Sequence, residues 1–506
     1  MAKSTSKQVL LNFGVHLMSF GLQFVLGIFL TPFLIEAFGI ESFGIIRLAT
    51  NTTSYVAIIA TSFSGAVNRF FIIELQKKEE LNAIKIFNTA LIVNLVFFLL
   101  CFPIMLLISL NSEKIFSIPD KDITASHFLF FTVQLGFFLG IFSVPFRAPA
   151  FAANRLDITN GIEIAKKLMR VVFTIIAATF FFQTIASLGA AFLLMDIITL
   201  TLVVTAGFKF APYLKMGFKY FDKENAKALF TMSGWLLVDA VGTLLFLNSD
   251  MMLVNIFYGA EASGRFSALI VWITLIRNVG NIFASVISPL IYKAYSKGEE
   301  AELERLLIFG TRIISIVVGI IIGLVVGYSE NLLSLWLGPE FGDSALLLSV
   351  MLLPWCFTLA MGPVYTVKTA YNYIKVPTFM LIGFGILNIG VILFCVKVLG
   401  LGVLSIPFCA AVIFTIRHFF EIGYLRHKKV LKTNKVILSV FSGAIIIPLV
   451  TLCGIYIQKL IVVANWPTFF LSGGVTGIIS VLVIFFVFIR PKERKMILGY
   501  IKAVKK

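Results

Sequence analysis

Long runs of apolar residues constrain the fold of this chain more than any other feature of its sequence. A helix that crosses the hydrocarbon core of a bilayer, about 30 Å thick, needs roughly 20 apolar residues, and the sequence contains fourteen runs of this kind. Because lipid offers no hydrogen-bond partners, each run must satisfy its backbone groups internally, as a helix does. We therefore predict an all-α, polytopic membrane protein with about fourteen transmembrane helices. The runs lie near residues 9–35, 43–72, 85–109, 125–149, 164–182, 187–208, 229–257, 264–292, 304–327, 343–370, 376–398, 401–425, 436–459 and 466–489.

The composition excludes a water-soluble globule, because 59% of the residues are hydrophobic and only 13% are charged. The first apolar run is too long for the core of a signal peptide and no small-residue cleavage site follows it, so we expect it to remain as a helix. The five cysteines lie singly inside predicted spans, without the paired spacing of a metal site or a disulfide framework. We expect them to pack as small hydrophobic side chains.

A formal net charge of +17 is typical of a protein that binds nucleic acid, but the distribution of the charges along this chain indicates a different partner. Lysine and arginine are concentrated in alternate loops, whereas the loops on the opposite side are net acidic. In membrane proteins the cytoplasmic loops carry the excess of positive charge. We therefore predict a chain embedded in the lipid bilayer with both termini in the cytoplasm, and no nucleic-acid partner.

The chain also contains an internal duplication. The stretch Gly39–Gly44 (GIESFG) returns as Gly259–Gly264 (GAEASG), an offset of 220, and at the same offset Lys77–Glu80 corresponds to Lys297–Glu300. Six predicted spans separate the copies, so both enter the membrane in the same direction, as in transporters whose lobes are related by an axis along the membrane normal. Both glycine-containing turns fall at external hairpins, where glycine permits a tight turn.

This duplication divides the chain into two pseudo-symmetric six-helix lobes and a terminal helix pair. The basic, aromatic segment between the lobes is expected to lie on the cytoplasmic membrane surface. The expected divisions are residues 1–208 for the N-terminal lobe, 209–228 for the interfacial linker, 229–429 for the C-terminal lobe, 430–489 for the two extra transmembrane helices and 490–506 for a basic cytoplasmic tail.

Polar residues at helical spacing follow one face of several apolar runs. Small polar side chains within membranes often serve only to hold helices together. A polar face that is repeated in both lobes also fits a substrate path, and these two interpretations stay open for the uncharged positions. The candidate substrate-binding residues are Arg277, Arg47, Arg69, Asn51, Asn281, Gln23 and His16.

The arginines are the strongest of these candidates, because an ionised group near the bilayer centre costs at least about 2.5–3.5 kcal/mol. Arg277 lies about thirteen residues, or roughly 20 Å of helix rise, into its run and is the best single candidate. Arg47 and Arg69 lie near the ends of the second run, so they either meet substrate or extend to the membrane surface. Guanidinium groups grip phosphate with a planar, permanently charged fork. The pattern therefore favours an anionic ligand, such as a diphosphate headgroup, over a cationic drug.

Three aspartates in predicted spans form a second candidate set. Asp250, Asp239 and Asp196 either neutralise the buried arginines or bind a coupling H⁺ or Na⁺ ion. His16 either carries a proton or forms a hydrogen bond that serves packing. We expect no metal, no other cofactor and no catalytic residue, since the external loops are too short for the chemistry of a membrane glycosyltransferase or polymerase, and no P-loop motif occurs.

Taken in order along the chain, several loose motifs together resemble polysaccharide or O-antigen lipid flippases, the Wzx-like branch of the multidrug/oligosaccharidyl-lipid/polysaccharide exporter superfamily. They include TP at residues 31–32 before the first glycine turn, AVNR at 66–69, AANRLD at 152–157 and NSD at 248–250. The resemblance covers nearly the whole chain. It implies two six-helix bundles and a terminal pair that rock between inward-open and outward-open states.

The resemblance implies a function in surface polysaccharide biosynthesis: flipping of an undecaprenyl-diphosphate-linked oligosaccharide from the cytoplasmic to the periplasmic leaflet of the bacterial inner membrane. O-antigen of lipopolysaccharide is one such polysaccharide, and a polymerase and a chain-length regulator are the partners it suggests. Related lipid II flippases have cationic residues on helices one, two and eight. Arg47 and Arg277 match the second and the eighth, whereas the first run offers His16 and no arginine. The alternative is a cation-coupled small-molecule or multidrug antiporter, for which we would expect twelve spans and an acidic pocket.

Overall fold

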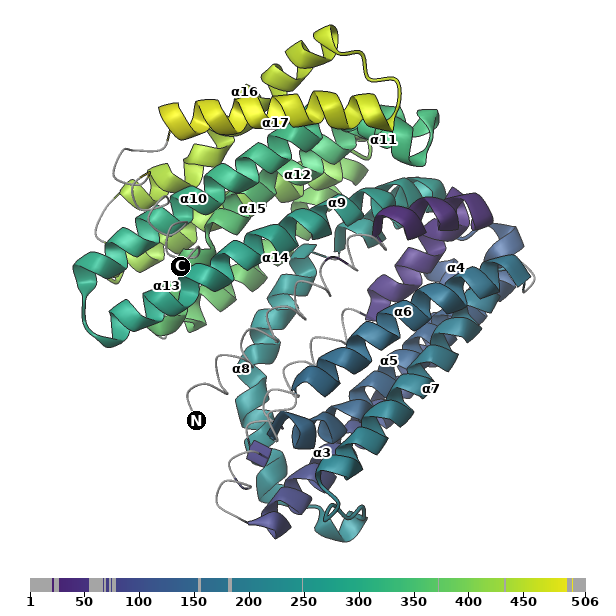
Figure 1. Cartoon of the computed structure of the whole chain (residues 1–506). Helices are drawn as coiled ribbons and strands as arrows, with labels where there is room; N and C mark the ends of the chain where they lie inside the picture. The colour runs from purple at the N-terminus through teal and green to yellow at the C-terminus, as the bar shows by residue number, and fades with distance from the viewer. Residues whose placement is uncertain are drawn as a thin grey trace. The chain divides into compact units, whose positions relative to one another are not determined.

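A computed structural model of the chain shows a helical protein. The residues it describes are Gly21, 27–53, Val67, 70–71, Glu74, 79–152, 156–180, 184–247, 249–371, 373–431, 434–488 and Arg494. Throughout these residues the regular secondary structure is helical (Figure 1). The prediction of an all-α membrane protein is confirmed.

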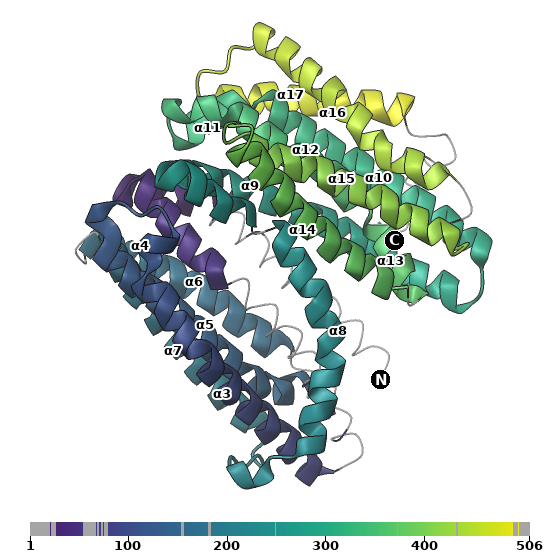
Figure 2. The same ribbon diagram turned by 180° about the vertical axis from the view of Figure 1, so that it is seen from behind.

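The helices follow one another along the chain with short connections (Figures 1 and 2). Two helical stretches, Gly27–Phe38 and 40–53, precede the labelled ones. The labelled elements are α3 (Glu80–Leu110), α4 (Ser112–Ile115), η1 (Asp120–Asp122), α5 (Ile123–Ala152), α6 (Leu156–Phe180), α7 (Ile185–Phe210), η2 (Phe218–Tyr220), α8 (Lys223–Leu247), α9 (Ser249–Ser296), α10 (Glu300–Gly327), α11 (Ser329–Leu337), η3 (Pro339–Ser344), α12 (Ala345–Ala360), α13 (Gly362–Ala370), α14 (Lys375–Lys397), α15 (Ser405–His427), α16 (Lys435–Leu460) and α17 (Trp466–Val487).

Two compact units make up the chain, Met1–Ala268 and Leu269–Lys506, and each is described by itself. Among the described residues, ten helices are long and apolar enough to cross a membrane. The number fourteen stays a prediction, because the first two apolar runs lie partly outside the described residues and because α6 and α8 are not among the ten. The chain is a multi-pass membrane protein.

Helices of the first unit pack closely where glycine leaves room. In this unit α5 lies along α7, α6 along α7 and α3 along α5. A Cβ at Gly207 of α7 would lie 2.7 Å from the carbonyl oxygen of Phe146 on α5, so only glycine fits there. Phe146 also meets Phe87 of α3 edge to face, with ring centres 5.0 Å apart. Phe146 and Phe87 belong to one buried apolar core that α3, α5 and α7 share.

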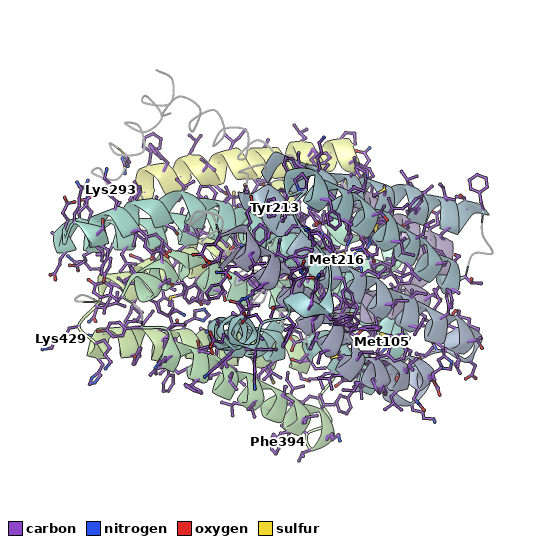
Figure 3. All side chains as sticks on the ribbon, turned by 90° about the horizontal axis from the view of Figure 1, so that it is seen from below. Met105, Tyr213, Met216, Lys293, Phe394 and Lys429 are labelled. Atoms are coloured by element: carbon purple, nitrogen blue, oxygen red, sulfur yellow. The ribbon has the colours of Figure 1, made fainter. Side chains whose placement is uncertain are left out.

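Hydrogen bonds join the predicted interfacial linker, residues 209–228, to the first part of α3. Asn88 Nδ2 donates to the carbonyl oxygen of Lys215 at 2.7 Å, and Asn88 Oδ1 accepts from the N–H of Gly217 at 2.8 Å. In the same segment Met216 (labelled in Figure 3) and Phe218 are 60% and 75% exposed. Exposed apolar side chains beside lysines are typical of a segment that lies in a membrane interface.

The two repeated glycine turns share an unusual backbone conformation. Gly39 has a φ of 81° and Gly259 a φ of 88°, values that glycine adopts readily because it has no Cβ. Both copies thus have glycine in a conformation that suits it, whereas their location at external hairpins stays a prediction. The second turn lies inside α9, with helical residues on both sides of Gly259, and the helix bends there.

The seventh predicted span, residues 229–257, falls on α8 and on the first part of α9. The eighth predicted span, residues 264–292, forms the part of α9 that follows the bend at Gly259. The bend at Gly259 therefore lies between these two predicted spans.

A short loop before α5 joins the two copies of the repeat. Ser42 Oγ, beside the first glycine turn, donates to Asp122 Oδ2 at 2.7 Å. The N–H of Ser117 donates to Asn255 Oδ1 at 2.9 Å, and Asn255 Nδ2 donates to Ser263 Oγ, beside the second turn, at 3.1 Å. Asn255 is completely buried. Both repeat copies are therefore tied to the same loop.

In the second unit α10 packs along α16, and α12 lies against α10 and α15 (Figure 2). The approach of α10 to α16 again depends on glycine, since a Cβ at Gly319 would lie 2.8 Å from Cα of Gly443. The N–H of Gly443 donates to Ser315 Oγ at 2.8 Å. The hydroxyl of Tyr328, which follows α10, lies 2.7 Å from Oγ of Ser472 on α17. The terminal pair, α16 and α17, is thus an integral part of the second unit.

Candidate functional site

The predicted site residues fall in different parts of the chain. Those in the first unit are Arg47, Asn51, Asp196 and Asp250, and those in the second are Arg277 and Asn281. His16, Gln23 and Arg69 lie outside the described residues, and Asp239 lies on α8 with a side chain outside them. The site is therefore built separately in each unit.

Arg277 lies on α9 with its guanidinium group against an aromatic ring. Its Cζ is 4.9 Å from the centre of the Trp355 ring on α12. Trp355 packs in turn against Phe414 of α15, with ring centres 6.0 Å apart. Within the described residues no carboxylate forms an ion pair with Arg277. A guanidinium held against an indole ring keeps its N–H donors available for a ligand, and Asn281, one turn further along α9, is exposed.

A buried polar network joins α13 and α15 in the second unit. Glu421 Oε1 accepts from Lys368 Nζ at 2.9 Å, and Glu421 Oε2 lies 3.5 Å from Arg417 Nη1. Arg417 Nη2 donates to the hydroxyl of Tyr365 at 3.0 Å. The side chains of Arg417 and Glu421 are 7% and 1% exposed. One buried carboxylate is thus shared by two cations.

The hydrogen bonds of His418 define its protonation in this network. His418 Nδ1 lies 2.5 Å from the carbonyl oxygen of Phe414, so this nitrogen carries the proton and donates it. His418 Nε2 lies 3.0 Å from the hydroxyl of Tyr365, which already accepts from Arg417. Nε2 is therefore the acceptor of the tyrosine O–H. The ring is a neutral imidazole that donates to Phe414 and accepts from Tyr365.

None of these network residues is among the predicted site residues, although the sequence contains their signal. Arg417, His418 and Glu421 interrupt the apolar run 401–425, and charges inside a membrane span are functional candidates by default. Their partner Lys368 lies at the end of a different run. Spacing alone does not reveal that the two helices meet.

Arg47 of the first unit is also held by an aromatic ring. Its Cζ is 5.2 Å from the centre of the Phe43 ring, one turn earlier, and its Nη2 is 3.5 Å from Oγ1 of Thr31. Its Nε is buried and has no hydrogen-bond partner in the structure. Among the described residues no carboxylate neutralises Arg47. Asn51, one turn further, is half-buried.

Asp196 on α7 forms an ion pair with Lys166 of α6. The distance from Asp196 Oδ1 to Lys166 Nζ is 2.7 Å, and the aspartate side chain is 13% exposed. Its other oxygen, Oδ2, packs against Gly136 of α5, and a Cβ at Gly136 would clash with this oxygen. The sequence leaves open whether Asp196 neutralises an arginine or binds a coupling ion, and in the structure its ion-pair partner is a lysine.

Two cations of α6, Lys166 and Arg170, are further residues that the predicted site lacks. They lie near the beginning of the run 164–182, so the sequence places them at the membrane surface end of a predicted span. In the structure α6 begins at Leu156, which places both cations well inside the helix. Arg170 Cζ lies 4.4 Å from the centre of the Phe192 ring on α7.

Asp250 lies in the first turn of α9. Its side chain is half-buried. Its role, in neutralising an arginine or in binding a coupling ion, stays a prediction.

The second unit contains a cavity of about 100 Å³ at the ends of α10, α13 and α15. Tyr371, Tyr373, Glu304 and Lys428 are among its lining residues, together with Lys429 (labelled in Figure 3). None of the predicted site residues lines this cavity. It carries charges of both signs and is separate from Arg277 and Trp355.

Comparisons with known proteins agree with these features. Residues 6–295 match the family described as polysaccharide biosynthesis protein. The chain is 26% identical to "Uncharacterized membrane protein EpsK" of Bacillus subtilis (strain 168), over 98% of each chain. Its fold is similar to that of the lipid II flippase MurJ in an inward closed conformation, with a TM-score of 0.63, 15% identity and coverage of 92% and 98% of the two chains.

A second similar structure is the inward-facing conformation of a multidrug resistance transporter of the MATE family, in the MOP superfamily. The TM-score is 0.62 at 11% identity, and the match covers 80% of this chain and 96% of that one. Sequence identities this low carry information about fold and not about substrate. The family match spans more than half of the chain, and with the helical architecture it shows that this transporter-fold protein belongs to the polysaccharide biosynthesis protein family.

Proposed function

We propose that this protein flips an undecaprenyl-diphosphate-linked oligosaccharide across the bacterial cell membrane by alternating access. The observation that carries the proposal is Arg277, whose guanidinium lies against Trp355 without a carboxylate partner among the described residues. The family, whose name refers to polysaccharide biosynthesis, and a fold similar to that of a lipid flippase support it. The transported molecule then serves surface polysaccharide synthesis, with O-antigen as one candidate product.

The charge of the site favours a diphosphate over other headgroups. Arginine binds phosphate through two parallel N–H donors, and these donors lie at the edge of the guanidinium plane, away from a ring that faces it. Arg47 has a similar environment, with Phe43 as its ring. A site with uncompensated arginines repels organic cations. A cation-coupled antiporter is therefore the second candidate function, which the MATE-like fold supports and the arginines disfavour.

The membrane orientation and the energy source are further parts of the proposal. We place both termini in the cytoplasm, with the linker around Met216 and Phe218 on the membrane surface, where its exposed apolar side chains enter lipid. The coupling ion is H⁺ or Na⁺. A polysaccharide polymerase and a chain-length regulator are the proposed protein partners.

A test of the proposal measures surface polysaccharide in cells that depend on this protein, with the amount of membrane-inserted protein measured in parallel. Arg277→Ala is expected to abolish export at normal protein levels. Arg277→Lys is expected to impair it as well, because lysine keeps the charge and loses the planar fork. Arg265→Ala is the matched control, since Arg265 lies on the same helix, 3.1 Å from Glu261 in an exposed ion pair.

The same cells distinguish the two candidate functions. Normal export in the Arg277→Ala strain would show that the site assignment is wrong. Efflux of cationic dyes by the wild-type protein, without any effect of its deletion on surface polysaccharide, would replace the flippase with the antiporter.

A further inference from the structure

Three charged residues line one face of α6 in the first unit. Glu163, Lys166 and Arg170 follow one another at steps of three and four residues, which places them on the same side of a helix. Glu163 Oε1 accepts from Arg147 Nη1 at 2.6 Å, and Lys166 Nζ lies 2.7 Å from Asp196. Two of the three charges are therefore compensated by neighbouring helices.

Arg170 differs from the other two because no carboxylate pairs with it in the described part of the chain. Its recorded contact is with the ring of Phe192, at 4.4 Å. Asp196 attracts it, but that carboxylate is engaged with Lys166 and pressed against Gly136. Because Lys166 and Asp196 neutralise each other, the positive charge of Arg170 is not compensated by a carboxylate among the described residues. Its side chain is exposed, so a ligand can reach it.

Arg47 contributes a second cation to the same place. Figures 1 and 2 both show the segment 27–53 (purple) beside α6. The positive charges of Arg47 and Arg170, one on each of these elements, repel each other. Arg47 has a buried Nε that no acceptor satisfies. Two like charges with a buried unsatisfied donor cost free energy unless an anion joins them.

We infer that Arg47 and Arg170 form a phosphate-binding subsite within the first unit, to which Arg170 contributes a residue that the predicted site lacks. Phe43 and Phe192 hold one face of each guanidinium group, and the N–H edges bind a phosphate that lies between the two arginines. The inference rests on the proposed function in naming a lipid-linked diphosphate as the ligand. Inorganic diphosphate has the same chemistry, and the experiment separates the two sources.

The test uses the full-length protein in lipid nanodiscs and measures the binding of undecaprenyl diphosphate and of inorganic diphosphate. Arg170→Gln is expected to weaken binding of the lipid roughly tenfold or more, because one charged fork is lost. Arg170→Lys is expected to recover only part of that loss. Arg265→Gln, in the same unit but in an exposed ion pair with Glu261, is expected to bind like the wild type. Unfolding temperatures of all variants are measured, so that loss of fold is recognised.

The double variant Arg47→Gln/Arg170→Gln shows whether the arginines act on one phosphate. If the two arginines share one phosphate, the double variant loses affinity by a smaller factor than the product of the two single-variant factors. The reason is that the first substitution already breaks the interaction that the second would break. Independent, multiplying losses overturn the shared subsite. Wild-type binding by Arg170→Gln at an unchanged unfolding temperature overturns it as well.

Failure of this inference and failure of the proposed function give different results. If Arg277→Ala abolishes export while Arg170→Gln binds lipid diphosphate normally, the flippase stands and the subsite is wrong. If the wild type binds inorganic diphosphate through Arg170 but has no affinity for the lipid, the subsite stands and the proposed function is wrong.

Discussion

Gly44 and Gly264, which the internal repeat places 220 residues apart, lie backbone to backbone. A Cβ at Gly44 would be 2.8 Å from the nitrogen of Gly264 and 2.7 Å from the carbonyl oxygen of Ala260. A Cβ at Gly264 would clash with the carbonyl oxygen of Ile40. The last glycine of each copy is thus a contact point for the other copy, and neither position has room for any other residue.

Replacing either glycine is expected to destabilise the first unit. Gly44→Ala and Gly264→Ala both force a methyl group against rigid backbone, which costs about 1–3 kcal/mol. Thermal unfolding in detergent measures the effect as a lower midpoint temperature. Gly140→Ala is the control, because Gly140 lies in α5 with nothing within 4 Å of the position of its Cβ. Equal midpoints for Gly44→Ala and Gly140→Ala would contradict the contact.

Substitution of Gly259 tests conformational strain without a steric clash. Its φ of 88° and ψ of 179° belong to a region that only glycine occupies readily, yet nothing lies within 4 Å of the position of a Cβ. Gly259→Ala and Gly259→Asn should therefore destabilise alike, by about 1–3 kcal/mol, because asparagine tolerates left-handed helical turns but not this extended conformation. Rescue by asparagine, measured as an unfolding midpoint above that of the alanine variant, would argue for a different backbone conformation.

The sequence predicts the helical architecture well because a membrane leaves the backbone few choices. The glycine turns could also be predicted, since the duplication marks Gly39 and Gly259 as equivalent before any coordinates exist. The beginning of α6 as early as Leu156 could not, because the charged face of this helix makes it less apolar than the other spans.

The contacts within the candidate site are even harder to predict from the sequence. Charges inside apolar runs identify Arg47, Arg277 and Asp196 as unusual residues, but which charge meets which depends on packing between distant helices. Asp196 forms an ion pair with Lys166 and is therefore not a free carboxylate. That pairing depends on how α6 lies against α7. Trp355 is a further example, because nothing in its local sequence shows that it lies beside Arg277.

Trp355 is expected to position Arg277 for its ligand. Trp355→Leu removes the aromatic face and should reduce polysaccharide export several-fold at normal protein levels, a loss of roughly the 0.5–2 kcal/mol typical of a cation–π contact. Trp355→Phe keeps a ring and should retain most of the activity. Export is measured beside the unfolding temperature, since a role in packing alone would lower the temperature in both variants without separating their activities.

Asp222 gives the linker a pH-dependent contribution to stability. Its pKa lies below the usual value of 3.8, chiefly because the N–H of Asn225 donates to the carboxylate, with Lys85 as a further contributor. A lowered pKa stabilises the folded state above about pH 4, and this contribution is lost as the pH falls through the folded-state value. Asp222→Ala should cost about 1 kcal/mol at neutral pH, as for loss of a helix cap. The difference in unfolding midpoint from wild type should shrink in acid.

Asp222→Asn separates the cap from the charge. Asparagine still accepts from the first N–H groups of α8, so this variant should lie between wild type and alanine at neutral pH. An alanine variant whose deficit is the same at pH 7 and in acid would contradict the role assigned to the carboxylate.

The network around Glu421 is expected to be more sensitive to partial than to complete removal. Glu421→Gln leaves Lys368 and Arg417 facing each other without their shared anion, and breaking a buried pair in this way typically costs about 3–5 kcal/mol. Lys368→Met in the same background removes one of the two cations that have lost their anion and should recover part of the stability. Unfolding temperatures of both single variants and the double variant give the coupling directly. Additive losses would show that Lys368 and Glu421 do not stabilise each other, and that the hydrogen bonds of Tyr365 and His418 hold α13 against α15 instead.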